Sequence, residues 1–570
     1  MWNNMSDPVR VLGIHDNHNA SICLLEDGEV LFSLQEERLN GIKNFNGFPK
    51  NALLRALELH RIGLEDIDFF AFGTIHNPAW RDRRATKERY ASPAWKKYCE
   101  DFFKASPFFK IFKSQKTRNR LNFLAGLGIR KEKTRFYDHH TAHAAAALHC
   151  SGFSGRTLIL TLDGGGDDAC SGVFISENGN LSQVSRTPEG NSIGNIYAVS
   201  TFYMGMTPLE HEYKLMGMAP YSQEKYFSGI PRSLQGLLRV DGIRFRRSTL
   251  ATTANSLSIL EKIYRNQRFD AVCGGLQDFT ERLVVQWVKN AIHETGIHRV
   301  CLAGGVFMNV KLNKLIAELP EVENLFIMPS CGDESNAIGA SFLAYNDYCS
   351  SHGQEMKTMP LSDLYLGESF DASVIRSEIQ KAGFQYHTED NVNQYVAEML
   401  AGNRIVARCS GRSEWGARAL GNRSILANPE SFETVSKIND AIKMRDFWMP
   451  FAGTVPEHAM DTYLKNPKKI PSPYMMLAFD TTDKRSSIRA ATHPKDKTIR
   501  PQILIREQNV DYYTLIENFS KLTGTCCVLN TSFNLHGSPM VYHPKEALDT
   551  LKNSDLDILV MDNLVVTKNT

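Results

Sequence analysis

Short apolar runs that end in turn residues mark the first part of the chain. Residues 9–16 (VRVLGIHD) predict a buried strand, and residues 20–34 predict two strands joined by a turn at Asp27-Gly28. The pattern recurs when residues 156–166 (RTLILTLDGGG) are followed at residues 169–184 by a second apolar hairpin pattern. A strand, a polar loop and a hairpin thus occur twice, about 150 residues apart, which favours a duplicated architecture.

Segments in which apolar residues recur at helical spacing lie between and after these strands. This spacing predicts helices at residues 49–63, at residues 139–150 and from about residue 277 to residue 294. Residues 299–313 and 323–345 each predict a strand, a glycine turn and a helix. In such βα units the backbone N–H groups of the turn can bind phosphate. The region therefore predicts an α/β domain.

A polar stretch at residues 350–363 predicts a boundary between a domain at 1–355 and a second at 364–570, which is long enough for its own core. Within the first domain, residues 80–135 are expected to form a basic insert. Its residues 96–135 hold twelve Lys and Arg against three Asp and Glu, interleaved with Phe. Such a segment could bind nucleic acid or a membrane surface. We interpret it as an inserted helical subdomain with a solvated face, because it contains no legible RNA-binding motif.

Composition narrows the class of protein. The 570 residues include 65 Lys and Arg against 63 Asp and Glu, so global charge gives no argument for a nucleic-acid or membrane partner. The eleven cysteines have no metal-type pairing and suit reduced thiols in a cytoplasmic protein. No run of about 18 apolar residues is present, so we expect no membrane span.

Four residues form a candidate metal site. His139 and His143 are four apart at the start of a predicted helix, so that both imidazoles project from one face. Asp163 and Asp333 follow predicted strands, and carboxylates beside imidazoles suit iron or manganese. The alternatives are an incidental histidine pair and aspartates that cap a turn or a helix.

Glycine loops supply a second candidate site. They occur at residues 164–166, at Gly304-Gly305 and at Gly332, each after an apolar strand. Glycine ends strands in many proteins, so each loop alone is a weak signal. Together with the duplication they resemble the two-lobed phosphate clamp of actin-like and sugar-kinase-type ATPases.

Cations concentrate in the second domain, among aromatic and aliphatic residues rather than other polar ones. They are Arg412, Arg418, Arg423, Lys443, Arg445 and Arg500, and short polar side chains follow at Asn530, Thr531 and Ser532. Guanidinium groups and lysine suit a phosphate and a triphosphate. The alternative is a solvated basic face, but the apolar surroundings favour burial around an anion.

Ordered motifs over nearly the whole chain carry a family resemblance. They are HNAS (18–21), DHHTAHAA (138–145), LTLDGGGD (160–167), EYKLMGMAPY (212–221), AGGVFMNVKLN (303–313), GDESNAIGA (332–340), GRSEWGARALGNRS (411–424), IKMRDFWMPFA (442–452) and NTSFN (530–534). The sequence resembles the carbamoyltransferases that make carbamate esters in natural products, such as nodulation factors, nebramycin, novobiocin and saxitoxin-type toxins.

The resemblance implies a fold and a reaction. It implies a duplicated actin-like domain that binds iron and transfers the carbamoyl group, followed by an α+β domain similar to threonylcarbamoyl-AMP synthase. The second domain would convert carbamoyl phosphate and ATP, with Mg²⁺, to carbamoyl-AMP. The first would transfer the carbamoyl group to a hydroxyl of a small-molecule acceptor and release AMP.

The resemblance also assigns residues. The metal ligands would be His139, His143, Asp163 and Asp333. The adenylate-binding set would be Gly164, Gly165, Gly304, Gly305, Asn309 and Gly332, with Lys214 nearby in the pattern. The carbamoyl phosphate and ATP set would be Arg418, Arg423, Ser424, Lys443, Arg445, Arg500, Asn530 and Ser532. We expect catalytic roles for His18 as acceptor base, His143, Arg418 and Lys443.

Three departures from the family pattern affect these assignments. Asn19 stands where the family has an acid after His18, and Ala417 replaces a proline before Arg418. One extra residue also precedes Arg500. Two other classes stay open: a tRNA-modifying threonylcarbamoyl-type transferase, and a non-catalytic actin-like nucleotide-binding module. We favour the small-molecule enzyme, with nucleic acid and membrane disfavoured as partners and a homodimer allowed.

Overall fold

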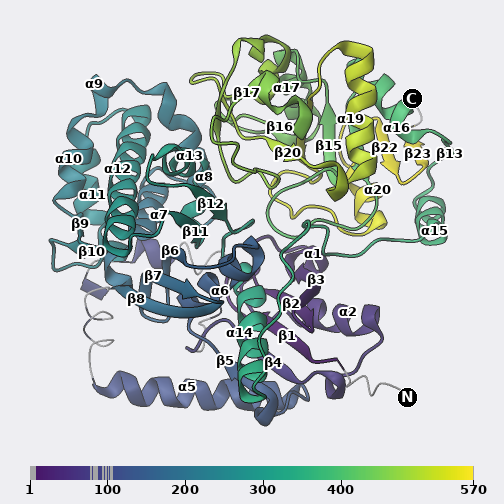
Figure 1. Ribbon diagram of the computed structural model, residues 1–570. Helices are drawn as coiled ribbons and strands as arrows, with labels where there is room; N and C mark the ends of the chain where they lie inside the picture. Colours follow the sequence, from purple (N-terminus) through teal and green to yellow (C-terminus); the bar gives the residue numbers. More distant parts are fainter. Residues whose placement is uncertain are drawn as a thin grey trace. The chain divides into compact units, whose positions relative to one another are not determined.

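The computed structural model describes residues 8–568 apart from 77–79, 81–87, 93–94, 97–98, 100–101 and 103–106 (Figure 1). The chain divides into two compact units. The first contains residues 1–36 and 44–361, and the second contains residues 37–43 and 362–570. Among the described residues, no helix has both the length and the apolar character needed to cross a membrane.

The first unit is built from two sheets with the same topology. Their orders are β3-β2-β1-β4-β5 and β8-β7-β6-β11-β12. In each sheet three antiparallel strands come first, and two strands parallel to the first of them complete the sheet. The strands are β1 (Arg10–His15), β2 (Ser21–Glu26), β3 (Glu29–Gln35), β4 (Phe69–Phe72), β5 (Thr134–Phe136), β6 (Thr157–Gly166), β7 (Ala169–Glu177), β8 (Asn180–Pro188), β11 (Arg299–Ala303) and β12 (Asn324–Ile327). The predicted duplication and α/β class are confirmed.

The two predicted hairpin turns join corresponding strands of the two sheets, β2 to β3 in one and β7 to β8 in the other. Asp27 and Gly28 have φ of 47° and 87°, and Asn178 and Gly179 have φ of 52° and 82°. Asn, Asp and Gly tolerate this left-handed conformation, which matches the twist of the flanking strands.

Helices connect and cover these sheets (Figure 1). They are α2 (Lys50–His60), α5 (Pro107–Gly126), α6 (His139–Ser151), α7 (Ile193–Tyr203), α8 (Glu212–Met218), α9 (Glu224–Phe227), α10 (Gly229–Gln235), α11 (Leu257–Tyr264), α12 (Phe269–Thr295), α13 (Val310–Glu318) and α14 (Ser335–Ser351), with a β9 (Leu238–Asp241) and β10 (Arg244–Arg247) hairpin. The helix α12 starts before the predicted residue 277, because buried Ala271, Val272 and Leu276 extend its apolar face. The helix α5 lies in the predicted basic insert, part of which falls outside the described residues.

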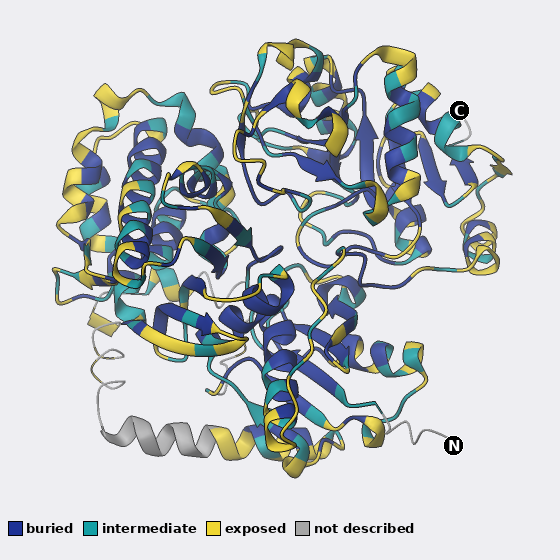
Figure 2. Ribbon diagram, in the orientation of Figure 1, coloured by how far each residue is buried: buried dark blue, intermediate teal, exposed yellow. Residues whose placement is uncertain are grey.

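The helix α14 determines where the functional side chains of this unit lie. It packs on both β1 and α6 and is buried over much of its length (Figure 2). A Cβ atom at Gly13 of β1 would lie 1.9 Å from the carbonyl oxygen of Ala337. A Cβ atom at Gly339 would lie 1.8 Å from the carbonyl oxygen of Ala142 in α6. Backbone contact therefore fixes the start of α14 against both elements.

The second unit is built around an eight-stranded mixed sheet of order β13-β23-β22-β14-β15-β21-β16-β20. Its strands are β13 (Tyr386–Thr388), β14 (Val406–Cys409), β15 (Arg423–Ala427), β16 (Ala452–Pro456), β20 (Gln502–Leu504), β21 (Val528–Ser532), β22 (Ile558–Met561) and β23 (Leu564–Thr567). One core lies between the sheet and α16 (Val392–Ala401) with α19 (Val510–Thr523), and the other lies under α15 (Ala372–Ala382) and α20 (Pro544–Lys552). The remaining elements are α17 (Phe432–Ile438), α18 (Met460–Tyr463) and a small sheet of β17 (Leu464–Lys465), β18 (Phe479–Thr481) and β19 (Thr498–Ile499).

One segment belongs to the second unit although first-unit residues flank it. Residues 37–43, which include α1 (Glu37–Asn40), group with the second unit. Within that unit Nη2 of Arg38 donates to the carbonyl oxygen of Gly416 at 2.6 Å. No local pattern in the sequence indicated this assignment, because the partner lies 378 residues away.

Candidate functional site

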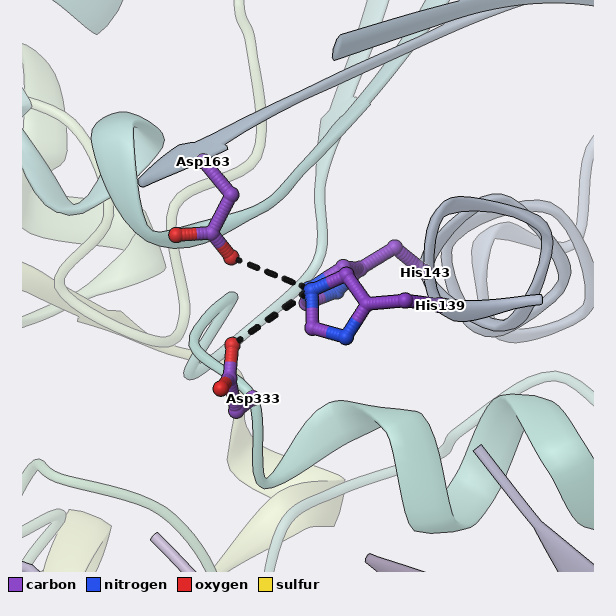
Figure 3. A group of neighbouring side chains, drawn as sticks. All are labelled: His139, His143, Asp163 and Asp333. Carbon is purple, nitrogen blue, oxygen red and sulfur yellow. Dashed lines mark ion pairs between the residues drawn. The ribbon is translucent and has the colours of Figure 1, made fainter. Parts of the chain in front are cut away.

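The four predicted metal ligands of the first unit come together (Figure 3). His139 and His143 lie one turn apart on α6, and their ring centroids are 4.7 Å apart. Nε2 of His143 lies 3.2 Å from Oδ2 of Asp163, and both Nε2 atoms lie 3.7 Å from Oδ1 of Asp333. One potential ligand atom from each residue lies within 4.8 Å of the other three. We name this set the His/Asp cluster.

Hydrogen bonds to the start of α14 orient both imidazoles. Oγ of Ser335 donates to the carbonyl oxygen of Gly332 at 2.8 Å, so it accepts from Nδ1 of His143 at 3.1 Å. Nδ1 of His139 lies 3.2 Å from the side-chain amide of Asn336, whose Oδ1 has no other partner. A half-turn of that amide makes Oδ1 the acceptor of Nδ1–H. Both Nε2 lone pairs are then directed toward the carboxylates.

The buried ligand atoms of the His/Asp cluster suit a positive partner. Nε2 of His139, Nε2 of His143 and Oδ2 of Asp163 are buried without a hydrogen-bond partner among the described residues. Burial lowers the pKa of His139, but the carboxylates of Asp333 and Asp163 outweigh it and raise this pKa to about 9. Burial and Asp333 oppose ionisation of Asp163, and the facing imidazoles outweigh both, so its pKa falls to about 2. A divalent cation fits this set of two imidazole and two carboxylate ligands.

The predicted glycine loops gather beside Asp163. The backbone N–H of Gly304, after β11, donates to the carbonyl oxygen of Cys331 at 2.9 Å, next to Gly332. A Cβ atom on Gly305 would lie 3.2 Å from Oδ1 of Asp163. These backbone segments therefore border the His/Asp cluster. Gly164 and Gly165 continue from Asp163 within β6.

The other two predicted adenylate-binding residues are Asn309, whose side chain forms hydrogen bonds within the protein, and Lys214, which lies on the separate helix α8. Oδ1 of Asn309 caps α13 by accepting from the N–H of Leu312, and its amide also exchanges hydrogen bonds with Gln277. Lys214 lies half-buried on α8. Asn309 therefore positions a helix in this structure.

His18 lies in the loop after β1 and is half-buried. It forms an isolated β-bridge with Asn46. The side-chain amide of the next residue, Asn19, donates to Oε2 of Glu334 at 3.2 Å. Since Glu334 follows Asp333 directly, this hydrogen bond ties the His18 loop to the His/Asp cluster.

Predicted cations of the second unit form a separate group. Nζ of Lys443, which is 3% exposed, donates to Oδ1 of Asn534 at 2.6 Å and to Oγ of Ser532 at 3.2 Å. Burial and nearby Arg445 lower the pKa of Lys443. Burial, then Arg418 and Arg445, lower the pKa of Arg500 in the same way. We name Arg418, Lys443, Arg445 and Arg500 the cation cluster.

The cation cluster lacks charge compensation at two of its members. Among the described residues, none provides a carboxylate within 4.0 Å of Lys443 or Arg500, and none accepts a hydrogen bond from Arg500. Arg445 donates to Oγ1 of Thr531 at 3.0 Å and stacks on Phe451. Such a concentration of positive charge favours an anionic ligand.

Ser424 and Asn530 support the loop that carries Arg418. Oγ of Ser424 accepts from the N–H of Gly421 at 3.0 Å, and the amide of Asn530 donates to the carbonyl oxygen of Ala419 at 3.2 Å. Both side chains are buried. They thus hold the two ends of the segment that follows Arg418.

Arg423 differs from the other predicted phosphate-binding cations. It is 1% exposed, and its guanidinium donates to backbone carbonyl oxygens. The acceptors are those of Ser410, Gly411, Asn422 and Tyr542. With its donors committed to backbone, Arg423 stabilises loops rather than joining the cation cluster.

Sequence reasoning missed several partners of the two clusters. Ser335 and Asn336 lie within the quoted GDESNAIGA motif, and Asn534 ends the quoted NTSFN motif. Each lies within three positions of a residue that was assigned, so the motifs themselves contained the signal. Their roles depend on contacts more than 85 residues apart in the chain.

Comparisons with known proteins show the family to which the chain belongs. A family described as "Carbamoyltransferase N-terminus" matches residues 10–342, and "Carbamoyltransferase C-terminus" matches residues 397–568. Nodulation protein NolNO of Sinorhizobium fredii is 30% identical over 97% of this chain and 79% of its own length. The uncharacterized protein sll1178 of Synechocystis is 29% identical over 97% of this chain and 95% of its own length.

Similarity to solved structures is weaker. Component A of (R)-2-hydroxyglutaryl-CoA dehydratase from Acidaminococcus fermentans gives a TM-score of 0.33 at 17% identity, covering 58% of this chain and 96% of that one. A score this low carries no argument about function. The two family matches span both units and include both clusters, and on these grounds the chain is a member of the carbamoyltransferase family.

Proposed function

We propose that this carbamoyltransferase is an ATP-dependent O-carbamoyltransferase that works through carbamoyl-AMP. Carbamoyl phosphate, ATP and water give carbamoyl-AMP, phosphate and pyrophosphate in the second unit. In the first unit a hydroxyl oxygen of a small-molecule acceptor attacks the carbamoyl carbon, and AMP leaves. The observation that carries the proposal is the cation cluster, since a family member that used a single transfer site would have no need for it.

The cation cluster would bind the phosphate groups of both donors. Lys443 and Arg500 face no described carboxylate, so phosphate oxygens can neutralise them. Ser532 and Asn534 hold the ammonium group of Lys443 in place before a ligand arrives. Donors fixed in this way stabilise the charge that develops on the phosphates without reorganising during the reaction.

The His/Asp cluster would hold Fe²⁺ or Mn²⁺ through His139, His143, Asp163 and Asp333. A bound cation supplies Lewis-acid charge for a carbamoyl or phosphate oxygen. The backbone at Gly304, Gly305 and Gly332 borders the cluster and would position the adenylate.

His18 would accept the proton of the acceptor hydroxyl. A neutral imidazole can accept a proton near pH 7. The hydrogen bond between Asn19 and Glu334 supports this role, because it holds the loop beside the residue that precedes α14. The alternative role of His18 is structural, as a residue that stabilises the loop.

Labile intermediates give a physical reason to join both activities in one chain. Carbamoyl phosphate and a mixed anhydride with AMP both react with water, so exclusion of all water except the one that the reaction consumes protects them. The tRNA-modifying alternative was based on the basic segment 96–135, part of which lies outside the described residues. It stays a hypothesis, and the small-molecule acceptor is the proposal.

Two measurements on the full-length protein test the proposal. The first is pyrophosphate release from ATP that depends on carbamoyl phosphate and proceeds without an acceptor. The second is incubation with a panel of hydroxylated metabolites and mass spectrometry for the gain of one carbamoyl group. Absence of carbamoyl phosphate-dependent pyrophosphate release would overturn the adenylate mechanism.

A further inference from the structure

His15, the last residue of β1, has no part in the function proposed above. Its side chain is 0% exposed, and neither ring nitrogen has a hydrogen-bond partner among the described residues. Buried polar atoms in folded proteins are nearly always paired, so an exception needs an explanation. The surroundings of His15 provide one.

The two oxygens of Asp333 face different histidines. Oδ1 lies 3.7 Å from Nε2 of His139 and from Nε2 of His143, on the side of the His/Asp cluster. Oδ2 lies 3.6 Å from Nε2 of His15. The carboxylate therefore faces the ligand imidazoles of α6 with one oxygen and an imidazole of strand β1 with the other, and the ring centroid of His15 lies 6.2 Å from that of His139.

Rigid packing maintains this arrangement. Asp333 lies just before α14, which is in backbone contact with β1 through Gly13 and Ala337. Gly13 is two residues before His15 in the same strand. Neither His15 nor Asp333 can shift far without separating α14 from β1.

We propose that His15 is a positioning residue for the metal ligand Asp333. With the cation bound, Nε2–H of His15 would close the 3.6 Å gap to Oδ2 and donate to it, which would leave Oδ1 as the ligand oxygen of this carboxylate. An oxygen engaged in this way would be a weaker ligand, so it would compete less with substrate for the cation. His15 is not itself a ligand, because its ring nitrogens lie outside the group of four mutually close ligand atoms. This inference rests on the proposed metal site.

The variants His15→Leu and His15→Gln of the full-length protein test the inference, with Co²⁺ as the probe. Leucine removes the donor, and glutamine places an amide N–H near the position of Nε2. We expect His15→Leu to weaken Co²⁺ affinity about 10–100-fold in competition with a chelator, as loss of an orienting partner does. Its visible Co²⁺ spectrum should change as Oδ2 becomes free to bind. His15→Gln should stay closer to the wild-type protein in both measurements.

His149→Leu is the matched control, because His149 is a buried histidine near the other end of α6, packed on Phe342. It should leave affinity and spectrum unchanged. Thermal unfolding with excess chelator checks that each variant folds, and His15→Asn, whose amide is too short, replaces His15→Leu if that variant does not. Wild-type affinity and spectrum in His15→Leu would overturn the role of His15. Failure of the wild-type protein to bind Co²⁺ would overturn the metal site together with it.

Discussion

The His/Asp cluster and the cation cluster differ in how their buried charges are compensated. In the first unit, two carboxylates face two imidazoles, and the pKa of Asp333 is held well below its usual range despite burial, because His139 and neighbouring imidazoles compensate. In the second unit, burial and like charges lower the pKa of Lys443 and Arg500. In the proposed function a cation would complete the first cluster and an anion the second. The metal and the phosphate donor would then have separate sites, so the two proposed half-reactions can be tested independently.

We expect His143→Ala to give the largest difference between the two half-reactions. Removing a ligand should cost more metal affinity than the 10–100-fold typical of an orienting partner, so acceptor carbamoylation should be lost with the metal. Carbamoyl phosphate-dependent pyrophosphate release should persist. Metal analysis beside both half-reactions measures this, with His149→Ala as the buried-histidine control. Equal loss of both half-reactions with retained metal would refute the division of labour.

His18→Ala tests whether the first unit contains the acceptor base in addition to the metal ligands. If His18 is the acceptor base, transfer should fall by about 10²–10⁴ near neutral pH, while metal binding and pyrophosphate release continue. His18→Gln keeps hydrogen bonding but cannot take the proton, so it should be equally slow. A glutamine variant with the wild-type rate and pH profile would leave His18 a structural residue.

Arg418→Ala addresses the cation cluster. Loss of one partner from a buried charged site costs about 3–5 kcal/mol, which corresponds to about 10²–10⁴ in rate. Pyrophosphate release should fall by that factor while metal content stays at the wild-type level. Arg404→Ala is the matched control, because Arg404 is an exposed arginine of the same unit that pairs with Asp557. Undiminished release in Arg418→Ala would remove Arg418 from the donor site.

The smallest effect concerns stability and pH in the ligand-free protein. Burial lowers the pKa of Lys443 in the folded state, whereas the unfolded chain has the ordinary value of 10.5. Between these two values the unfolded state binds more protons, so the free energy of unfolding rises with pH across this window. In Lys443→Met this contribution should vanish. Denaturant unfolding of both proteins at several pH values below 10.5 would show it, and identical pH dependence would contradict a lowered pKa of Lys443.

Local patterns predicted much of the fold and part of each cluster. Turn residues identified both hairpins, and the spacing of His139 and His143 put both imidazoles on one face of a helix. The orienting hydrogen bonds of Ser335 and Asn336 could not be predicted, because they join residues 192 and 197 positions apart. Arg423 shows the opposite difficulty. Its motif resembles a phosphate-binding cation, but only tertiary structure shows that backbone carbonyls occupy its donors.

The segment 37–43 has a consequence for any attempt to study the two halves of the reaction on separate polypeptides. The chain passes between the units at residues 36–37, 43–44 and 361–362. A single cut after residue 361 would leave Arg38 on one fragment and its acceptor, Gly416, on the other. Gly416 opens the loop that carries Arg418, so the severed second half would lose a hydrogen bond that supports the proposed donor site. Dissection by point substitution, rather than by truncation, is the approach this topology permits.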